Sequence, residues 1–382
     1  MKKIFYFTLI DYARKPTSSS LRILNVCKAI NNSREYSASI ISFSDAATKS
    51  IDGVKVFSSK KGVSLVRKIL NYVIFPFSSF MKMKHEQGDI GICYGLYGYP
   101  LIVYLILGKI YKIKMVFDAV EWYNYNSYKI KYFNVMVWSI SITMNYLLLY
   151  FDGIITISHY LENYYSIRKK KTLFLPPITV INRDSFSSKN KMCFEENYLN
   201  LVYTGIPGKK DYIEITIKGT QRLFEAGEKI KFHIFGCTYD NLLSNIPDLN
   251  LNKKCILCYG YIGQKELTEY MRGADFSVLI RDEKKRYAKA GFSTKFVHSL
   301  SVGLPVISNL TGDIGYYLKD NFNGYILEDA SEDAFVTKIR SVLNRDKQND
   351  LTLRKNAFQT AFDHFRVSNI YTDKIVAFLN TL

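Results

Sequence analysis

The sequence predicts an α/β protein made of two Rossmann-like domains whose parallel sheets face a central cleft. Strand-like and helical segments alternate along the chain, and the alternation stops once, at a polar stretch without periodicity over residues 183–199. It then restarts, which indicates two consecutive βαβ series and therefore two parallel sheets covered by helices. The length of 382 residues also fits two domains. In such sheets a ligand binds beyond the carboxyl ends of the strands, so the cleft is the expected site.

The first domain is expected over residues 1–182. Its apolar runs are short and β-rich, and between them the apolar residues follow the spacing of helices. Ser158 is a suitable N-cap for the helix that follows it. The expected strands cover residues 3–10, 37–43, 54–57, 89–94, 115–118 and 153–157, and the expected helices cover residues 21–30, 63–83, 100–109, a stretch that ends near residue 150, and 159–165.

The second domain is expected over residues 200–360, after a linker at residues 183–199. Residues 361–382 are expected to form a C-terminal helix that returns to the first domain. The expected strands cover residues 201–204, 231–235, 255–259, 276–280, 305–308 and 325–327, and the expected helices cover residues 213–226, 264–271, 294–300 and most of 333–382.

The net charge is uneven along the chain. The whole chain carries a formal charge of +18; residues 1–180 hold 24 Lys or Arg against 10 Asp or Glu, and residues 181–382 hold 28 against 24. A strongly basic half indicates an anionic partner, such as a nucleic acid, an anionic membrane surface or a phosphate-bearing substrate. A basic surface that serves only solubility is the alternative. The apolar content of 48% excludes a disordered chain.

Short motifs and the cysteine content indicate the expected compartment and the expected absence of a metal site. The apolar run at residues 4–10 is short and lacks a cleavage site, so no export signal is expected. Six cysteines, mostly in apolar runs, are typical of reduced thiols in a cytoplasmic protein. Cys255 and Cys258 form a C-x-x-C without a second ligand pair, so no metal site is expected. The uncharged stretch 133–151 contains polar residues, which favours a buried or membrane-lying helix over a span.

The first candidate ligand loop joins a strand to a helix at residues 204–211, with the sequence TGIPGKKD. Gly205 lets the backbone approach a ligand, and the amides at the start of the next helix attract anions. Lys209 and Lys210 add positive charge that suits a diphosphate. The spacing is neither that of a P-loop nor that of a dinucleotide-binding G-x-G-x-x-G loop. An ordinary turn with exposed lysines is the alternative.

A second candidate loop follows the strand that ends at residue 280. Arg281 comes first, then a basic loop, and the sequence AGFSTKFVHSL at residues 290–300 passes from loop to helix. Gly291 permits a close approach to a ligand, and free amides near Thr294 would point at an anion. His298 lies one helical turn later on the same face. A purely structural loop is the alternative.

A third candidate pairs two carboxylates at the end of a strand in the basic domain. Asp118 and Glu121 directly follow the strand that is expected at residues 115–118. Carboxylates at this position can abstract a proton or bind sugar hydroxyls. A helix-capping Asp beside an exposed Glu is the alternative.

Several stretches, taken in order, resemble retaining glycosyltransferases of the GT-B fold, and glycosyltransferase family 4 in particular. The most specific stretch is AGFSTKFVHSLSVGLPVISN at residues 290–309. The loop at residues 203–211, Arg281, and Asn-Gly at residues 323–324 fit the same family. In the first domain, FDAVEWY and DGIITISHYLENYY resemble its acceptor domain.

The resemblance implies that the C-terminal domain binds a nucleotide-activated sugar. Lys210 and Arg281 would hold the diphosphate and stabilise it as it leaves, and Asp118 or Glu121 would orient the acceptor. Two acidic residues usually flank the Gly-Phe loop of this family, but this chain has Ala290 and His298 there. The other donor-binding residues that the resemblance implies are Gly205, Lys209, Gly291, Phe292, Ser293, Thr294, Lys295 and His298.

The resemblance also implies transfer of a sugar to a glycan acceptor with retention of configuration, without a metal or other cofactor. The expected acceptor is carried on polyprenyl diphosphate, in capsule, O-antigen or exopolysaccharide synthesis. A basic domain would then hold the protein at the inner face of the cell membrane. A catalytically inactive partner subunit and a nucleotide-sugar isomerase of the same fold are the alternatives. Nucleic-acid binding is not supported, because no recognised module is present.

Overall fold

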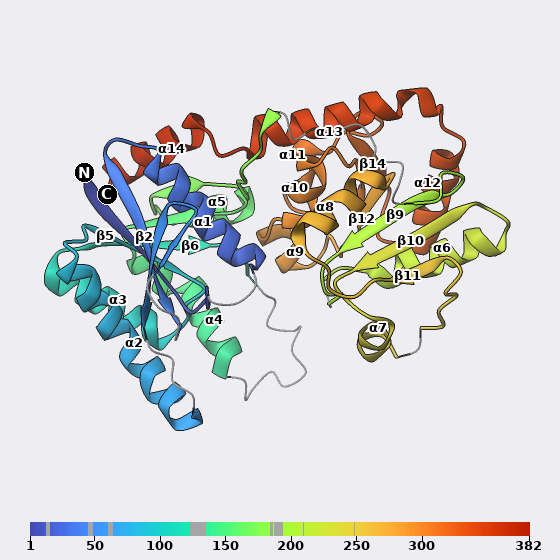
Figure 1. Cartoon of the computed structure of the whole chain (residues 1–382). Helices are drawn as coiled ribbons and strands as arrows, with labels where there is room; N and C mark the ends of the chain where they lie inside the picture. Colours follow the sequence, from blue (N-terminus) through green and yellow to red (C-terminus); the bar gives the residue numbers. More distant parts are fainter. Residues whose placement is uncertain are drawn as a thin grey trace. The chain divides into compact units, whose positions relative to one another are not determined.

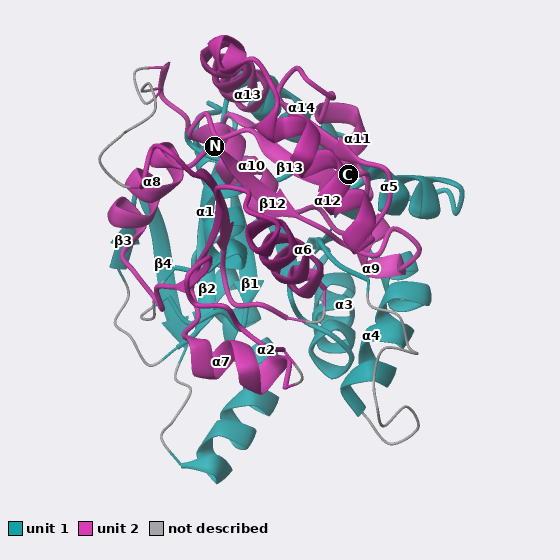
Figure 2. Ribbon diagram, turned by 90° about the vertical axis from the view of Figure 1, so that its right-hand side faces the viewer, with its two compact units in different colours: residues 1–180, 367–382 teal, residues 181–366 magenta. Residues whose placement is uncertain are grey.

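The structure is a computed structural model of the whole chain, and it describes residues 1–12, 16–44, 49–59, 64–122, 135–183, 186, 194–208, 210–247 and 249–382. The chain forms two compact units (Figure 1). Unit 1 consists of residues 1–180 and 367–382, and unit 2 consists of residues 181–366, as Figure 2 shows in two colours.

Unit 1 is built on a sheet in the strand order β3-β4-β2-β1-β5-β6-β7-β8. All of its pairs are parallel, as expected, except the pair of the short edge strand β3 with β4, which is antiparallel. β3 is a short edge strand that sequence patterning did not predict. The strands are β1 (Lys2–Thr8), β2 (Tyr36–Phe43), β3 (Lys49–Ile51), β4 (Val54–Ser59), β5 (Ile90–Tyr94), β6 (Lys114–Ala119), β7 (Gly153–Thr156) and β8 (Thr172–Phe174).

Side chains of β1 alternate between two apolar layers, as the strand period of two requires. Ile4 and Tyr6 belong to the core that α1 and α14 help to form. Phe7 faces the other way and stacks on Tyr104 of α3 at 4.5 Å. The helices of unit 1 are α1 (Ser18–Asn31), α2 (Leu65–His85), α3 (Tyr99–Tyr111), α4 (Val135–Asn145), the 3-10 turn η2 (Leu147–Tyr150), α5 (His159–Ser166) and α14 (Asn369–Asn380).

Unit 2 is built on a wholly parallel sheet in the order β11-β10-β9-β12-β13-β14. The central strands are buried along their whole length, as expected where helices cover both faces. The strands are β9 (Leu199–Thr204), β10 (Ile230–Phe235), β11 (Ile256–Cys258), β12 (Phe276–Leu279), β13 (Val306–Asn309) and β14 (Gly324–Leu327).

The helices of unit 2 agree with the expected alternation, with the short helices α7, α9 and α11 as additions. Residues 286–290 form the short helix α9, where the sequence indicated only a basic loop, and α7 follows β10. The helices are α6 (Ile213–Glu225), α7 (Tyr239–Asn245), α8 (Gln264–Gly273), α9 (Arg286–Ala290), α10 (Thr294–Ser301), α11 (Ile314–Tyr317), α12 (Glu332–Leu343), the 3-10 turn η4 (Lys347–Asn349) and α13 (Asp350–Phe365).

The chain leaves unit 2 at the end of α13 and re-enters unit 1, where α14 packs on α1. Ile375 and Phe378 of α14 are buried in the unit 1 core, and Thr372 Oγ1 donates to the carbonyl of Ala29 at 2.8 Å. Across the described residues, no helix is both long enough and apolar enough to cross a membrane.

Candidate functional site

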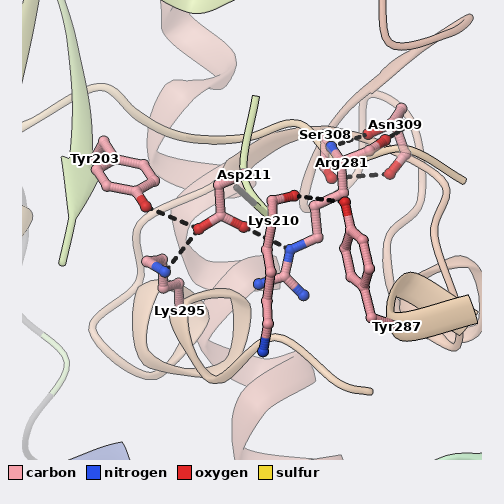
Figure 3. A network of polar contacts seen from close by, with 8 residues as sticks. All are labelled: Tyr203, Lys210, Asp211, Arg281, Tyr287, Lys295, Ser308 and Asn309. Atoms are coloured by element: carbon pink, nitrogen blue, oxygen red, sulfur yellow. Dashed lines mark hydrogen bonds and ion pairs between the residues drawn. The ribbon is translucent and has the colours of Figure 1, made fainter. Parts of the chain in front are cut away.

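The candidate site of unit 2 is centred on Asp211, in the loop between β9 and α6 (Figure 3). The chain leaves β9 at Thr204 and turns at Gly205, whose φ of +117° strongly favours glycine. A Cβ at Gly205 would stand 3.0 Å from Cε of Lys295. Gly205 therefore allows both the turn and the close approach of the Lys295 side chain.

Three side chains converge on the Asp211 carboxylate. Arg281 Nε donates to Oδ1 at 2.7 Å, and Lys295 Nζ donates to Oδ2 at 2.8 Å. The phenol of Tyr203 also donates to Oδ2 at 2.8 Å. These residues come from the ends of β9 and β12 and from the first turn of α10, so Asp211 joins three parts of the unit.

The carboxylate of Asp211 is buried and ionised. Burial alone would raise its pKa, but the charges of Arg281 and Lys295 and its hydrogen bonds hold that pKa well below its usual range. Burial and the adjacent Asp211 charge raise the pKa of Tyr203 well above its ordinary value, so its phenol keeps the proton that it donates. One negative and two positive groups leave the cluster with a net positive charge.

The backbone of Arg281 is fixed by Asn309, at the end of the neighbouring strand β13. Arg281 N donates to Asn309 Oδ1 at 3.0 Å, and Asn309 Nδ2 donates to Arg281 O at 2.7 Å. The Nε atom is held by Asp211. Within the described residues, the two terminal nitrogens of the guanidinium have no protein partner. They are the donors that this cluster can offer to a ligand.

Lys210 lies directly beside Arg281, because Asp211 and Arg281 form an antiparallel bridge. Its carbonyl accepts a hydrogen bond from the Tyr287 phenol at 3.3 Å. In Figure 3 the Lys210 side chain extends away from the Asp211 carboxylate. Lys209, the other predicted lysine of this loop, lies outside the described residues.

The amino end of α10 adjoins the same cluster, since Lys295 lies in its first turn. Ser293 is the N-cap residue, yet its side chain makes no capping hydrogen bond. Its hydroxyl oxygen is buried without a partner in the described structure. The start of α10 therefore has no side-chain cap, and a helix start of this kind attracts anions.

The Gly-Phe loop before α10 contains side chains that pack inside unit 2. Gly291 is in an extended conformation, with φ −99°, that any residue can adopt. The Phe292 ring is buried against Tyr317 and Phe365, at centroid distances of 5.7 and 5.6 Å. Ala290 is also fully buried. The side chains of Ala290 and Phe292 serve packing, and ligand binding by Gly291 and Phe292 stays a prediction.

His298 lies one turn into α10 and faces Gln264, at the start of α8. Nε2 of His298 accepts from the Gln264 amide at 3.1 Å, which places the imidazole proton on Nδ1. Desolvation lowers the pKa of His298 to about 4, so the ring is neutral at pH 7. A neutral ring can give or accept single hydrogen bonds but adds no charge to the site.

In unit 1, the structure places Asp118 inside the protein. Arg22 of α1 binds both carboxylate oxygens through Nε, and its Nη2 lies 2.8 Å from Oδ1. The Arg22 Nη1 donates to the carbonyls of Leu175 and Pro176. Both charged side chains are almost completely buried. As placed here, Asp118 has no exposed oxygen to offer an acceptor.

Glu121 lies past the end of β6, three residues from Asp118, and is partly exposed. Its neighbour Trp122 is buried and packs against Tyr164 at a centroid distance of 4.6 Å. The structure thus separates the two predicted carboxylates into a buried one and an accessible one. The acceptor role of Glu121 stays a prediction.

Sequence patterns did not assign roles to Asp211, Tyr203 or Asn309. Asp211 was visible only as the last residue of a basic loop, and its partners lie up to 84 residues away along the chain. An acidic residue among lysines at a strand-to-helix turn is the signal that could have found it.

These observations define a class: a two-domain α/β protein with a cationic, amide-rich site at the carboxyl ends of the strands in its second unit. Residues 187–360 match the family model described as glycosyl transferases group 1. The structure also resembles GT-B glycosyltransferases over its whole length. The chain therefore has the GT-B fold, which confirms the predicted fold class, and its residues 187–360 are similar to glycosyl transferases group 1, as the resemblance implied.

Three solved structures illustrate the likeness. Sucrose-phosphate synthase from Thermosynechococcus elongatus aligns with a TM-score of 0.75 at 11% identity, over 100% of this chain and 99% of that chain. Anabaena HepE in complex with UDP and glucose aligns with a TM-score of 0.71 at 14% sequence identity, over 100% of both chains. The lipopolysaccharide outer core galactosyltransferase WaaB aligns with a TM-score of 0.67 at 14% sequence identity, over 100% of this chain and 99% of that chain. No curated protein matches the sequence.

Proposed function

We propose that the chain transfers a sugar from a nucleotide-sugar donor to a glycan acceptor with retention of configuration, in the manner of glycosyltransferase family 4. The observation that carries the proposal is the Asp211 cluster, which holds Arg281 and Lys295 beside the uncapped start of α10. The donor diphosphate would bind the terminal nitrogens of Arg281, the ammonium of Lys210 and the amides at Thr294. Structures of HepE with UDP and with UDP-glucose support a nucleotide-sugar donor.

The proposed chemistry is electrostatic stabilisation of the leaving group. The bond between the anomeric carbon and the diphosphate oxygen breaks, and the acceptor oxygen forms its bond on the same face of the sugar. The acceptor proton passes to the departing phosphate, so no dedicated base is required. Preorganised donors of this kind contribute about 3 to 4 kcal/mol each. Because fixed cations stabilise the diphosphate, we propose that transfer needs no metal ion and persists in EDTA.

The acceptor is proposed to be a glycan on polyprenyl diphosphate, in capsule, O-antigen or exopolysaccharide synthesis. The likeness to WaaB, a lipopolysaccharide outer core galactosyltransferase, supports an acceptor of the bacterial surface. The basic first half of the chain supports an acceptor that carries phosphate at an anionic membrane. The protein would then work at the cytoplasmic face of that membrane, with Glu121 placed to orient the acceptor hydroxyl.

The test begins with a thermal-shift screen of UDP-, GDP- and dTDP-sugars. The stabilising donor is then used for hydrolysis without acceptor, and NMR reads the anomer of the released sugar. We expect the donor configuration to be retained, and Arg281→Ala to lower turnover about 10²- to 10³-fold. Arg222→Ala, which removes an exposed arginine of α6, is the matched control. Unchanged turnover in Arg281→Ala, or an inverted product, would overturn the proposal.

One observation favours a second candidate, an inactive partner subunit of the same fold. The two positions where the family usually carries acids hold a buried alanine, Ala290, and a neutral imidazole, His298. The same screen separates the candidates. A partner subunit would show no donor hydrolysis in the wild type, and Lys210→Ala would leave its complex with another transferase intact.

A further inference from the structure

Helix α2 exposes a continuous apolar stripe to solvent. Its members recur every three or four residues, which places them on one side of the helix. The buried side chains of the same helix include Phe75 and Met83, eight residues apart, which lie on the other side. The exposed members are Val66, Leu70, Val73, Phe77 and Met81, and Leu65, Ile69 and Ile74 flank them.

Helices α3 and α4 expose stripes with the same spacing. Ile106 of α3 is 53% exposed and Trp138 of α4 is 48% exposed. Phe77 of α2 has a similar exposed fraction, 46%. These large side chains contribute far more apolar surface than single scattered residues would. The α3 stripe is Tyr99, Ile102, Ile106 and Ile110, and the α4 stripe is Val135, Trp138 and Ile142, continued by Tyr146 and Tyr150.

The three stripes belong to neighbouring helices of unit 1 (Figure 1). Ser79 of α2 and Tyr104 of α3 share a buried hydrogen bond of 2.6 Å, and Tyr99 donates to the carbonyl of Val73. The start of α3 is joined to α4, because Gly98 N donates to Thr143 Oγ1 at 3.0 Å. We name the exposed side chains of these three stripes the apolar face. More than half of the exposed large apolar side chains in the described structure lie on α2, α3 and α4.

The charged residues within the three helices are all basic, although Glu86, just after α2, pairs with Lys82. Helices α2, α3 and α4 contain no aspartate or glutamate at all. They carry Arg67, Lys68, Lys82, Lys84 and Lys109. An apolar stripe flanked by basic residues is the pattern of helices that lie in the interface of an anionic bilayer.

A pocket of about 530 Å³ lies beside α3, and it is also lined by both apolar and charged side chains. Ile102 and Ile106 of the apolar face form one of its walls, and Tyr150 forms another. Lys109 and Lys112 also line it, together with the ion pair of Lys114 and Asp152, so the charged groups of the lining are net positive. Apolar walls with cationic groups beside them match a lipid, whose apolar chain and anionic headgroup are joined in one molecule.

We infer that the apolar face docks unit 1 onto an anionic lipid bilayer, with α2, α3 and α4 lying in the interface and their lysines and arginines at the headgroups. A second copy of the chain is a poorer occupant, because two such faces would bring like charges together. The inference goes beyond sugar transfer and does not depend on it: bilayer docking needs neither the donor nor an intact Asp211 cluster.

The experiment is flotation of the full chain with liposomes of neutral phosphatidylcholine, with and without anionic phosphatidylglycerol, at low and high salt. The apolar variant combines Leu70→Gln, Phe77→Gln and Ile106→Gln, all at exposed positions. Its matched control combines Ile167→Gln, Leu351→Gln and Ile370→Gln, which are equally exposed apolar residues elsewhere. A charge variant, Lys68→Gln with Lys109→Gln, is compared with Lys229→Gln and Lys355→Gln.

We expect the wild type and both controls to float with the anionic vesicles, and the apolar variant to bind at least tenfold more weakly. The charge variant should lose most of the preference for anionic over neutral vesicles, and high salt should have the same effect. Equal binding by the apolar variant and its control would overturn the inference. So would a wild type that ignores the vesicles and instead forms a dimer that the apolar variant abolishes in sedimentation. Donor hydrolysis, measured in parallel without vesicles, reports separately on the proposed function.

Discussion

Asp211 shows how a single buried carboxylate can prepare a cationic site without touching the ligand itself. Its oxygens are occupied by Arg281, Lys295 and Tyr203. The Asp211 carboxylate therefore positions Arg281 and Lys295. Its negative charge also offsets the repulsion between these two cations. The terminal nitrogens of Arg281 are left to face outward from this arrangement. On this reading Asp211 is a positioning residue of the proposed donor site.

Replacement of Asp211 by asparagine should lower both stability and turnover. The variant leaves Arg281 and Lys295 without a counter-charge in a largely buried place, a change that costs about 3 kcal/mol in comparable pairs. We expect the free energy of unfolding at pH 7, from urea titration, to fall by about that amount, and kcat to fall more than KM rises. Asp333→Asn, at an exposed position on α12, is the control.

The same variant makes a prediction for pH. The folded state holds the pKa of Asp211 below its unfolded value of about 4, so its stabilising contribution is complete above that value and is lost as the pH falls through it. The difference in unfolding free energy between wild type and Asp211→Asn should therefore be constant from pH 7 to 5. It should shrink as the pH falls below about 4. A difference that stays constant down to pH 2.5 contradicts the assignment.

The buried pair of Asp118 and Arg22 allows a structural role to be separated from an acceptor role. Asp118→Ala would leave the Arg22 guanidinium buried without its partner, at a cost of about 3 to 5 kcal/mol. Replacing both residues, with Asp118→Leu and Arg22→Met, should cost less than Asp118→Ala alone. Urea unfolding of the three proteins measures the difference. An Asp118→Ala protein of normal stability that fails only in transfer would instead support the acceptor role.

At the scale of the element, α10 has a side-chain-uncapped start, at which we propose the donor diphosphate to bind, and a neutral histidine one turn later. The pKa of His298 is lowered to about 4 by desolvation, whereas an unfolded histidine has a pKa of about 6.5. The unfolded chain thus takes up a proton first as the pH falls. The stability that depends on neutral His298 is complete above pH 6.5 and is lost between about 6.5 and 4.

His298→Gln should therefore flatten the pH dependence of stability in that window. We expect the melting temperature of the wild type to fall more between pH 7 and 4.5 than that of the variant. His85→Gln, at an exposed position at the end of α2, is the control and should resemble the wild type. A histidine proton resonance that titrates near pH 6.5 and disappears in His298→Gln would show that the ring is not held neutral.

The elements also show what sequence patterns can and cannot predict. The alternation of strands and helices predicted the fold class, and Gly205 marked the turn after β9, because local spacing and positive φ leave a local signal. The Arg22–Asp118 pair has no such signal, since its members are 96 residues apart and meet only through the sheet. The stretch 133–151 was expected to form a buried or membrane-lying helix, and its described part exposes apolar residues. The exposed stripes of α2 and α3 could not be predicted in the same way, because only the folded structure shows which apolar side chains stay exposed.

At the scale of the whole molecule, the two units differ in the number of chain segments that build them. Unit 2 is one continuous segment, residues 181–366, whereas unit 1 needs residues 367–382 to complete its core. Ile375 is fully buried and Phe378 nearly so, among side chains of β1, β2 and α1. Without α14, that apolar surface of unit 1 would be exposed to water.

Truncation after Arg366 should consequently destabilise unit 1 and spare unit 2. Losing two large buried side chains costs several kcal/mol by itself, at about 2 to 5 kcal/mol each. Differential scanning calorimetry of the full chain is expected to show separable transitions, of which a donor nucleotide shifts the unit 2 transition upward. In the truncated protein the nucleotide-sensitive transition should remain at its temperature while the other moves down or disappears. The point variant Ile375→Ala should move the same transition by a smaller amount. If the nucleotide-sensitive transition moved instead, α14 would support the donor unit, contrary to the division of the chain described above.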